Sequence, residues 1–305
     1  MARRKLFNFR LTKKQKRRFV TFLVLVLCVW GGFFFLKHPH PPRVSRIVSH
    51  RPVPRPVNRP VSRPTVHPIG LPASRLASRL TSRPKIAFVI DDIGAHNKLT
   101  NELAALDPRA TYAILPLLPY SRFFAQLGQE RHADVILHLP LDTSVLDQIP
   151  GPGLIVDTMS DEDVVDMLRR DLDSVPNHIG ANNHMGSKGT ADRRIMKLIL
   201  EEFKKNNIFF LDSYTSRSSV VAEVAREVGV PYATRGSFLD NVDEKPAILD
   251  AIKLLERTAR KRGSAIAIGH YRRNTLELLR TEIPRLETEG FEIVRLKDLI
   301  QKAKT

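Results

Sequence analysis

The sequence predicts an α/β fold whose parallel strands form a closed or nearly closed barrel. Short apolar runs alternate with longer amphipathic stretches along residues 85–305, which is the pattern of strands joined by right-handed helical crossovers. About seven such units occupy some 220 residues, which fits a barrel better than an open sheet. Polar side chains follow several of the apolar runs, at the edge where α/β folds place their sites.

The expected strands and helices mostly alternate along this region. Strands are expected at residues 86–90, 110–115, 133–139, 208–211, 231–234, 265–269 and 291–296. Helices are expected near residues 95–106, 120–131, 160–174, 190–206, 218–228, 244–262 and 273–289. Ser160 and Thr190 each stand just before a stretch with helical periodicity, so we expect both to be helix N-caps.

The stretch KIAFVIDDIG, from Lys85 to Gly94, is the central strand of this prediction. Five consecutive apolar residues follow Lys85, which is typical of a strand buried on both faces. Asp91 and Asp92 stand at its C-terminal end, where a strand gives way to a loop and both carboxylates can turn toward one cleft. These residues alone leave open an alternative, in which both side chains cap a helix that begins near Ala95.

The positive charge of the chain is concentrated ahead of the expected barrel. The protein has 49 Lys and Arg residues and 32 Asp and Glu residues, a formal charge of +17. Residues 1–84 hold 19 of the basic residues and no acidic residue, so residues 85–305 combine the other 30 with all 32 acidic ones. This nearly neutral domain lacks the basic surface of a nucleic-acid-binding protein, and the basic segment has no aromatic interleaving that could stack bases.

Residues 19–36 (FVTFLVLVLCVWGGFFFL) are an uncharged run just long enough to cross a bilayer core as one helix. We interpret the run as an uncleaved signal anchor, because it is longer than the apolar region of a cleaved signal peptide and lacks a small-residue cleavage site. Nine Lys or Arg residues precede it. The positive-inside rule therefore predicts a cytoplasmic tail at residues 1–18, a single pass through the inner membrane and a periplasmic or other extracytoplasmic domain.

Residues 37–84 are expected to be a linker between this anchor and the domain at residues 85–305. They hold 11 of the 21 prolines, often as the dipeptide Arg-Pro, which favours an extended chain. The positive charge of this linker would allow contact with anionic envelope polymers or lipid headgroups. The alternative is that the linker is only a solvated spacer. The only cysteine, Cys28, lies in the anchor, so no intramolecular disulfide is expected.

Polar residues that could form a site gather after the expected strands or after other short apolar steps, such as residues 178–181 and Phe238-Leu239. They are His138, Asp142, Asn182, Asn183, His184, Asp212, Ser213, Thr215, Asp240 and His270. Each taken alone has a structural explanation, such as a hydrogen-bonded His or an Asx-turn. Together with the Asp pair they predict a metal-dependent hydrolase. One carboxylate and two imidazoles are a common ligand set for zinc or another divalent ion, and a further carboxylate and imidazole would remain for proton transfer.

The motifs IDDIG, HLPLD, GANNHMGS, FLDSYT, SFLDN and IAIGH, in this order, resemble those of the divergent polysaccharide deacetylase family, relatives of the NodB-homology deacetylases. The resemblance implies a distorted (β/α) barrel of about seven strands, a divalent metal that is usually zinc, and removal of acetyl groups from an envelope polysaccharide. It also implies roles for five residues: Asp91 as the base, Asp92, His138 and His184 as metal ligands, and His270 as the acid. The other polar residues would contact the substrate or support these five.

Three features depart from the family pattern. No His-x-x-x-His pair follows His138, Asp142 stands where a Glu is expected, and Tyr271-Arg272-Arg273 replaces Pro-rich sequence after His270. The missing His pair leaves open an alternative of another class. On that alternative, the chain is a non-catalytic glycan-binding or scaffolding module with the same fold.

Overall fold

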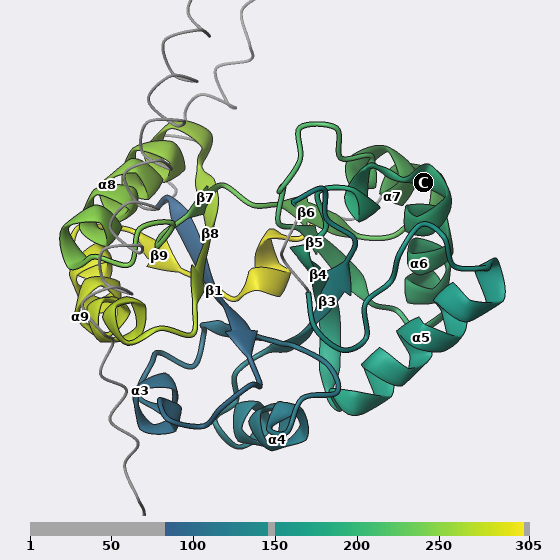
Figure 1. The fold of residues 1–305 in the computed structure, drawn as a ribbon. Coiled ribbons are helices and arrows are strands. Elements are labelled where there is room, and N and C mark those ends of the chain that lie inside the picture. The colour runs from purple at the N-terminus through teal and green to yellow at the C-terminus, as the bar shows by residue number, and fades with distance from the viewer. Residues whose placement is uncertain (1–82, 146–149, 302–305) are drawn as a thin grey trace, which may run out of the picture. The chain divides into compact units, whose positions relative to one another are not determined.

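The structure is a computed structural model that describes residues 83–145 and 150–301 (Figure 1). The anchor expected at residues 19–36 and nearly all of the linker lie outside the described residues, so both stay predictions. Within the described ranges, no helix combines the length and the apolar character needed to span a membrane.

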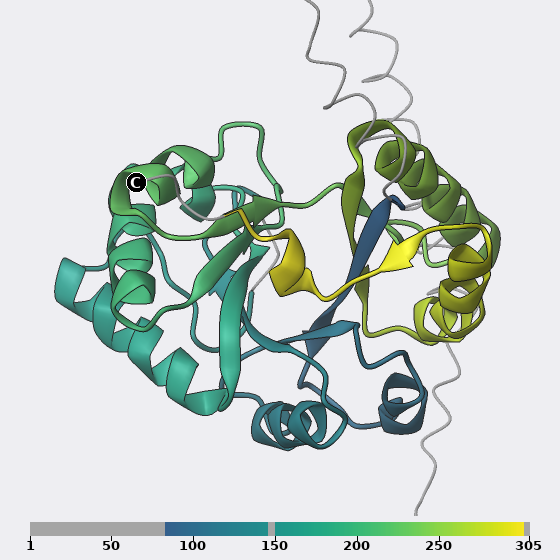
Figure 2. The same cartoon turned by 180° about the vertical axis from the view of Figure 1, so that it is seen from behind.

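A single curled sheet of nine strands forms the centre of the fold (Figures 1 and 2). The strands are β1 (Lys85–Ile93), β2 (Thr111–Ile114), β3 (Val135–Leu141), β4 (His178–Met185), β5 (Phe209–Asp212), β6 (Tyr232–Thr234), β7 (Ser237–Phe238), β8 (Ser264–His270) and β9 (Glu292–Ile293). Their order is β6-β5-β4-β3-β2-β1-β8-β7, β9 pairs with β1, and all of these ladders are parallel. Because no ladder between β6 and β7 is present among the described residues, the sheet is a curled half-barrel.

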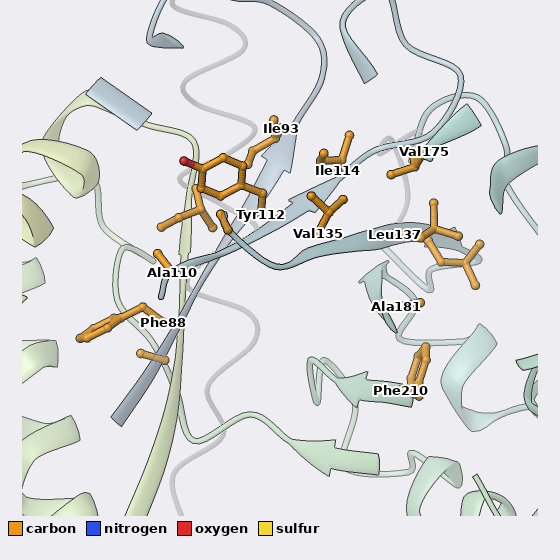
Figure 3. Packing of buried hydrophobic residues seen from close by; sticks show 14 of the residues in the cluster. Phe88, Ile93, Ala110, Tyr112, Ile114, Val135, Leu137, Val175, Ala181 and Phe210 are labelled. Carbon is orange, nitrogen blue, oxygen red and sulfur yellow. The ribbon is translucent and has the colours of Figure 1, made fainter. Parts of the chain in front are cut away.

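Helices cover the outer side of this sheet, as Figures 1 and 2 show. They are α3 (Thr100–Ala104), α4 (Ser121–Glu130), α5 (Asp161–Ser174), α6 (Arg193–Lys205), α7 (Val221–Val228), α8 (Lys245–Arg262) and α9 (Arg273–Thr288), with 3₁₀ turns η1 (Gly189–Ala191) and η2 (Leu296–Leu299). The larger buried cluster joins outward-facing strand residues to the helices. Phe88, Tyr112 and Phe210 belong to it and are labelled in Figure 3. Burial of this apolar surface stabilises the fold.

A second buried cluster fills the inner side of the sheet and supports the site. It includes Val89 of β1, Ile136 of β3 and Ile268 of β8, with Leu296 of η2 packed among them. Alternate residues of a strand face the same side, so the next inward positions along these three strands are Asp91, His138 and His270. An apolar floor therefore gives way to polar side chains at the C-terminal edge of the sheet.

The structure corrects several expected elements. Two strands, β4 and β7, were not among the expected seven; β4 (HIGANNHM) is too polar to be found as an apolar run. The helix expected near residues 95–106 is only α3, and the run at 291–296 contains only the two residues of β9. In these segments tertiary contacts decide the structure more than local periodicity does.

The two expected N-caps have different outcomes. The prediction for Ser160 is confirmed, because its side chain accepts a hydrogen bond from the Asp163 backbone N–H at the start of α5. The prediction for Thr190 is wrong. Thr190 lies in η1 and donates to the Gly186 carbonyl, whereas Asp192 accepts from the Ile195 N–H and caps α6. The 3₁₀ turn delays the start of α6 by about one turn.

Asp171 of α5 is a buried carboxyl group whose two oxygens have no hydrogen-bond partner among the described residues. Burial raises its pKa from the ordinary value of 3.8 to about 8. The folded protein then keeps the proton over a pH range in which the unfolded chain loses it. Stability should therefore fall as pH rises from about 4 to about 8 and change little from this cause above pH 8.

We expect Asp171→Asn to be more stable than the wild type by roughly 1–3 kcal/mol at alkaline pH, since the variant has no charge to bury. The difference should shrink toward acid pH, where both side chains are neutral. Urea unfolding at a series of pH values measures it. A stability difference that is the same at pH 4 and pH 9 would contradict the assignment of Asp171 as a buried, unpaired acid.

Candidate metal centre

The end of β1 brings two adjacent carboxylates to one side of the sheet. The ladder between β1 and β2 shifts register between Ile90 and Ile93, and Asp92 has a φ of 63°, an uncommon conformation for a residue other than glycine. Both Asp91 and Asp92 therefore approach the imidazole of His138, at 3.6 and 3.2 Å from its Nε2. They are not helix caps, because α3 begins only at Thr100 and has no side-chain cap.

Three atoms from three strands form a compact triangle at this edge. Asp92 Oδ1 lies 3.2 Å from His138 Nε2 and 3.1 Å from His184 Nδ1. The two imidazole nitrogens lie 3.1 Å apart. Asp92 Oδ1 is buried and has no hydrogen-bond partner with acceptable geometry in the described part of the chain. The structure therefore brings together the three residues that the sequence suggested as metal ligands.

The dimensions of this triangle fit one divalent ion. Ligand atoms at about 2.0–2.1 Å from a tetrahedral zinc ion are separated by about 3.3 Å, close to the observed separations of 3.1–3.2 Å. The unpaired Asp92 Oδ1 supplies a free acceptor, and the donor set of one carboxylate and two imidazoles suits zinc and related ions. With three protein ligands, a fourth position would stay open.

Charge around the triangle shifts the pKa values of its members. Burial alone would raise the pKa of Asp92, but His138 and His184 outweigh it and hold the pKa well below its usual range. Burial dominates for Asp91, so its pKa is raised. Burial would lower the pKa of His138, and the two carboxylates reverse that effect and raise it. The carboxylates and imidazoles of the site thus favour a positive charge beside Asp92.

A second pair of side chains, Asp240 and His270, lies beside the triangle. His270 is paired with Asp91 in the β1–β8 ladder, and its Nδ1 lies 2.6 Å from Asp240 Oδ1. Asp240 is fully buried and also accepts from the His270 backbone N–H and the Thr275 hydroxyl. Burial would lower the pKa of His270, but Asp240 outweighs it and raises the pKa, with Asp91 and Asp92 adding to the effect. Asp240 therefore stabilises a protonated imidazole and holds it through Nδ1.

A family model described as divergent polysaccharide deacetylase matches residues 88–300, which include every residue of this site. The chain belongs to the divergent polysaccharide deacetylase family. The resemblance seen in the sequence motifs is thus confirmed.

Two curated relatives are similar to this deacetylase-family chain over most of their lengths. An uncharacterized protein of Haemophilus influenzae is 36% identical over 220 residues, covering 72% of this chain and 78% of that protein. The uncharacterized protein YibQ of Escherichia coli is 29% identical over 218 residues, covering 72% and 68%. Among solved structures, uncharacterized protein ATU2773 from Agrobacterium tumefaciens has a TM-score of 0.68 at 22% identity, covering 72% of this chain and 89% of that one, which shows a shared fold.

The other expected site residues of this family member brace the loops around the triangle. Asp142 pairs with Lys188 at 2.9 Å, and Lys188 also contacts Asp157. The remaining contacts are those of Asp212 with the Tyr214 N–H and the Ser219 hydroxyl, of Asn183 with the Ser213 N–H and the Met185 carbonyl, and of Thr215 with the same carbonyl. None of these contacts reaches the three triangle atoms. Asn182 and Ser213 lie closer to the triangle, because Asn182 forms hydrogen bonds with His138, Asp91 and Ser213.

Sequence reasoning missed Arg235, a partly buried guanidinium whose charge lies near Asp91 and Asp212. It donates to the carbonyls of Ser213 and Tyr214, at 2.6 and 3.2 Å, and stacks over the Phe238 ring at 3.8 Å. Burial lowers its pKa, and Asp212 and Asp91 oppose that shift. The available signal was its position, because Arg235 is two residues beyond the inward-facing Ala233 of β6.

Proposed function

We propose that this protein is a metal-dependent deacetylase that removes acetyl groups from a cell-envelope polysaccharide. The observation that carries the proposal is the triangle of Asp92, His138 and His184, with a buried carboxylate and an Asp-supported imidazole beside it. Family membership supports the reaction class, since the family takes its description from polysaccharide deacetylation.

In the proposed hydrolysis, different residues of the chain have different roles. A divalent ion, which we propose to be zinc, would supply Lewis-acid polarisation of the acetyl carbonyl when held by the three ligands. Asp91, with Oδ2 on the triangle side, would accept the proton that the attacking water loses. His270, protonated and held through Nδ1 by Asp240, would give a proton to the departing amine or alcohol as its bond to the acetyl carbon breaks. The products would be acetate and the deacetylated sugar.

Acetate release by the full-length, zinc-loaded protein tests this function. We expect acetate from an acetylated envelope polymer, such as peptidoglycan, or from acetylated oligosaccharides, and we expect a chelator to stop its release. A zinc-loaded protein that binds such glycans but releases no acetate from any of them would contradict the proposal. It would favour the glycan-binding module instead.

We further propose that residues 19–36 anchor the domain to the inner membrane on its periplasmic side. The uncharged run and the nine basic residues before it support this topology. Protease added to spheroplasts that contain the full-length protein should digest the domain at residues 85–305 while a cytoplasmic marker protein stays intact. Protection of the domain under these conditions would contradict the topology.

A further inference from the structure

Asn182 is a neutral side chain between two functional groups of the site. It is fully buried, and it pairs with His138 in the β3–β4 ladder. Its amide oxygen lies 2.9 Å from His138 Nδ1, and its amide nitrogen donates to Asp91 Oδ1 at 2.9 Å. One amide group thus contacts both His138 of the triangle and the neighbouring carboxylate of Asp91.

These contacts define which atoms of His138 carry its proton and its free electron pair. The amide nitrogen of Asn182 also donates to Ser213 Oγ at 3.2 Å, so both of its hydrogens are used. The amide oxygen can only accept, so it takes the hydrogen on His138 Nδ1. The lone pair of His138 is then on Nε2, the nitrogen that lies 3.2 Å from Asp92 Oδ1. A partner of this kind fixes the tautomer of a metal-ligating His.

The same amide also orients Asp91. With Oδ1 held by Asn182, the oxygen that faces His138 Nε2 is Oδ2, at 3.6 Å. An apolar residue at position 182 would leave two buried polar groups, His138 Nδ1 and Asp91 Oδ1, without a partner. A carboxylate at position 182 would lie against the buried carboxylate of Asp91. An amide serves both neighbours because it has a donor end and an acceptor end.

We propose that Asn182 is a positioning residue that directs His138 Nε2 toward the metal and Asp91 Oδ2 toward the water to be activated. The inference rests on the proposed function, because it assumes that the triangle holds a metal. The two effects use different ends of the amide. Substitutions at this position should therefore separate metal binding from proton transfer.

Zinc affinity and acetate release of three full-length variants test this separation. Asn182→Ala removes both ends of the amide, so we expect zinc to bind roughly 10–100-fold more weakly and acetate release to fall. Asn182→Asp keeps an acceptor for His138 and loses the donor to Asp91, so zinc affinity should stay close to wild type while acetate release falls by roughly 10–100-fold. Ser213→Ala removes only the third contact of the amide and should be close to wild type in zinc affinity.

The zinc affinities come from competition with a chromophoric chelator, starting from metal-free protein, and need no turnover. Folded Asn182→Ala with wild-type zinc affinity would overturn the inference, as would Asn182→Asp that loses zinc to the same extent as Asn182→Ala. If Asn182→Ala does not fold, the near-isosteric Asn182→Asp decides: retained zinc with reduced acetate release supports the inference, and either loss of zinc or wild-type acetate release overturns it. If the wild type releases no acetate, the proposed function and the role at Asp91 both fail, and the zinc affinities still decide the role at His138.

Discussion

Replacing Asp92 or His184 by Ala is expected to remove stoichiometric zinc from the full-length protein. Each residue supplies one corner of the triangle, with Asp92 Oδ1 and His184 Nδ1 only 3.1 Å apart, so the two remaining ligands would hold an ion weakly. An ion that binds only the folded chain adds about 4 kcal/mol of stability at 1,000 times its dissociation constant. Both variants should therefore lose most of the rise in melting temperature that zinc gives the wild type. Elemental analysis and thermal melts with and without zinc measure the two effects.

His178→Ala is the matched control for this prediction. His178 lies at the other end of β4, where its Nδ1 contacts the Val175 carbonyl. Its loss removes an imidazole from the same strand without touching the triangle, so zinc content should stay at the wild-type level. Stoichiometric zinc in both Asp92→Ala and His184→Ala would show that the triangle is not the metal site.

Asp91→Asn is expected to keep zinc and to lose turnover. The substitution preserves the shape of the side chain but removes the charge that would accept a proton. Loss of a general base costs roughly 10²–10⁴-fold in rate.

His270→Ala should show a similar loss in the rate of acetate release from acetamido sugars. The loss should be smaller on an aryl acetate, whose leaving group departs without being protonated. Rates of acetate release from the two substrate types, with zinc content measured in parallel, test both expectations.

A buried carboxylate at the opposite end of the sheet serves as the control for these rates. Asp134 lies just before β3, where Arg295 and Lys297 contact its Oδ1 at 3.2 Å. Asp134→Asn should therefore leave the rate of acetate release unchanged, even if it lowers stability. Wild-type acetate release from zinc-loaded Asp91→Asn would exclude Asp91 as the base.

The strand-end residues were predictable because their signal is local. The run from Lys85 to Ile90 identifies β1, and the inward parity of its residues continues directly into Asp91. His138 can be placed in the same way at the end of an apolar run. The polar motif around His184 predicts a site residue at that position, although its strand, β4, is too polar to be predicted as a strand. For these residues, the local sequence pattern alone predicts the edge of the sheet at which they lie.

Other features depend on contacts between distant residues, which no local pattern reveals. The partnership of Asp240 with His270 joins residues 30 positions apart, and Arg235 reaches the carbonyl of Ser213 across 22 positions. The gap between β6 and β7 is equally non-local, because their separation depends on how the whole sheet curls. Counting strand–helix units predicted a closed or nearly closed barrel, whereas packing in the described part of the chain gives a half-barrel.

The claim that Asp92, His138 and His184 hold one divalent ion is tested most directly by anomalous diffraction at the zinc edge, using crystals of the protein grown with zinc. We expect a single strong anomalous peak within the site, at about 2 Å from Asp92 Oδ1, His138 Nε2 and His184 Nδ1. Absence of a peak at this triangle in zinc-containing crystals, or a peak held by other residues instead, would contradict the claim.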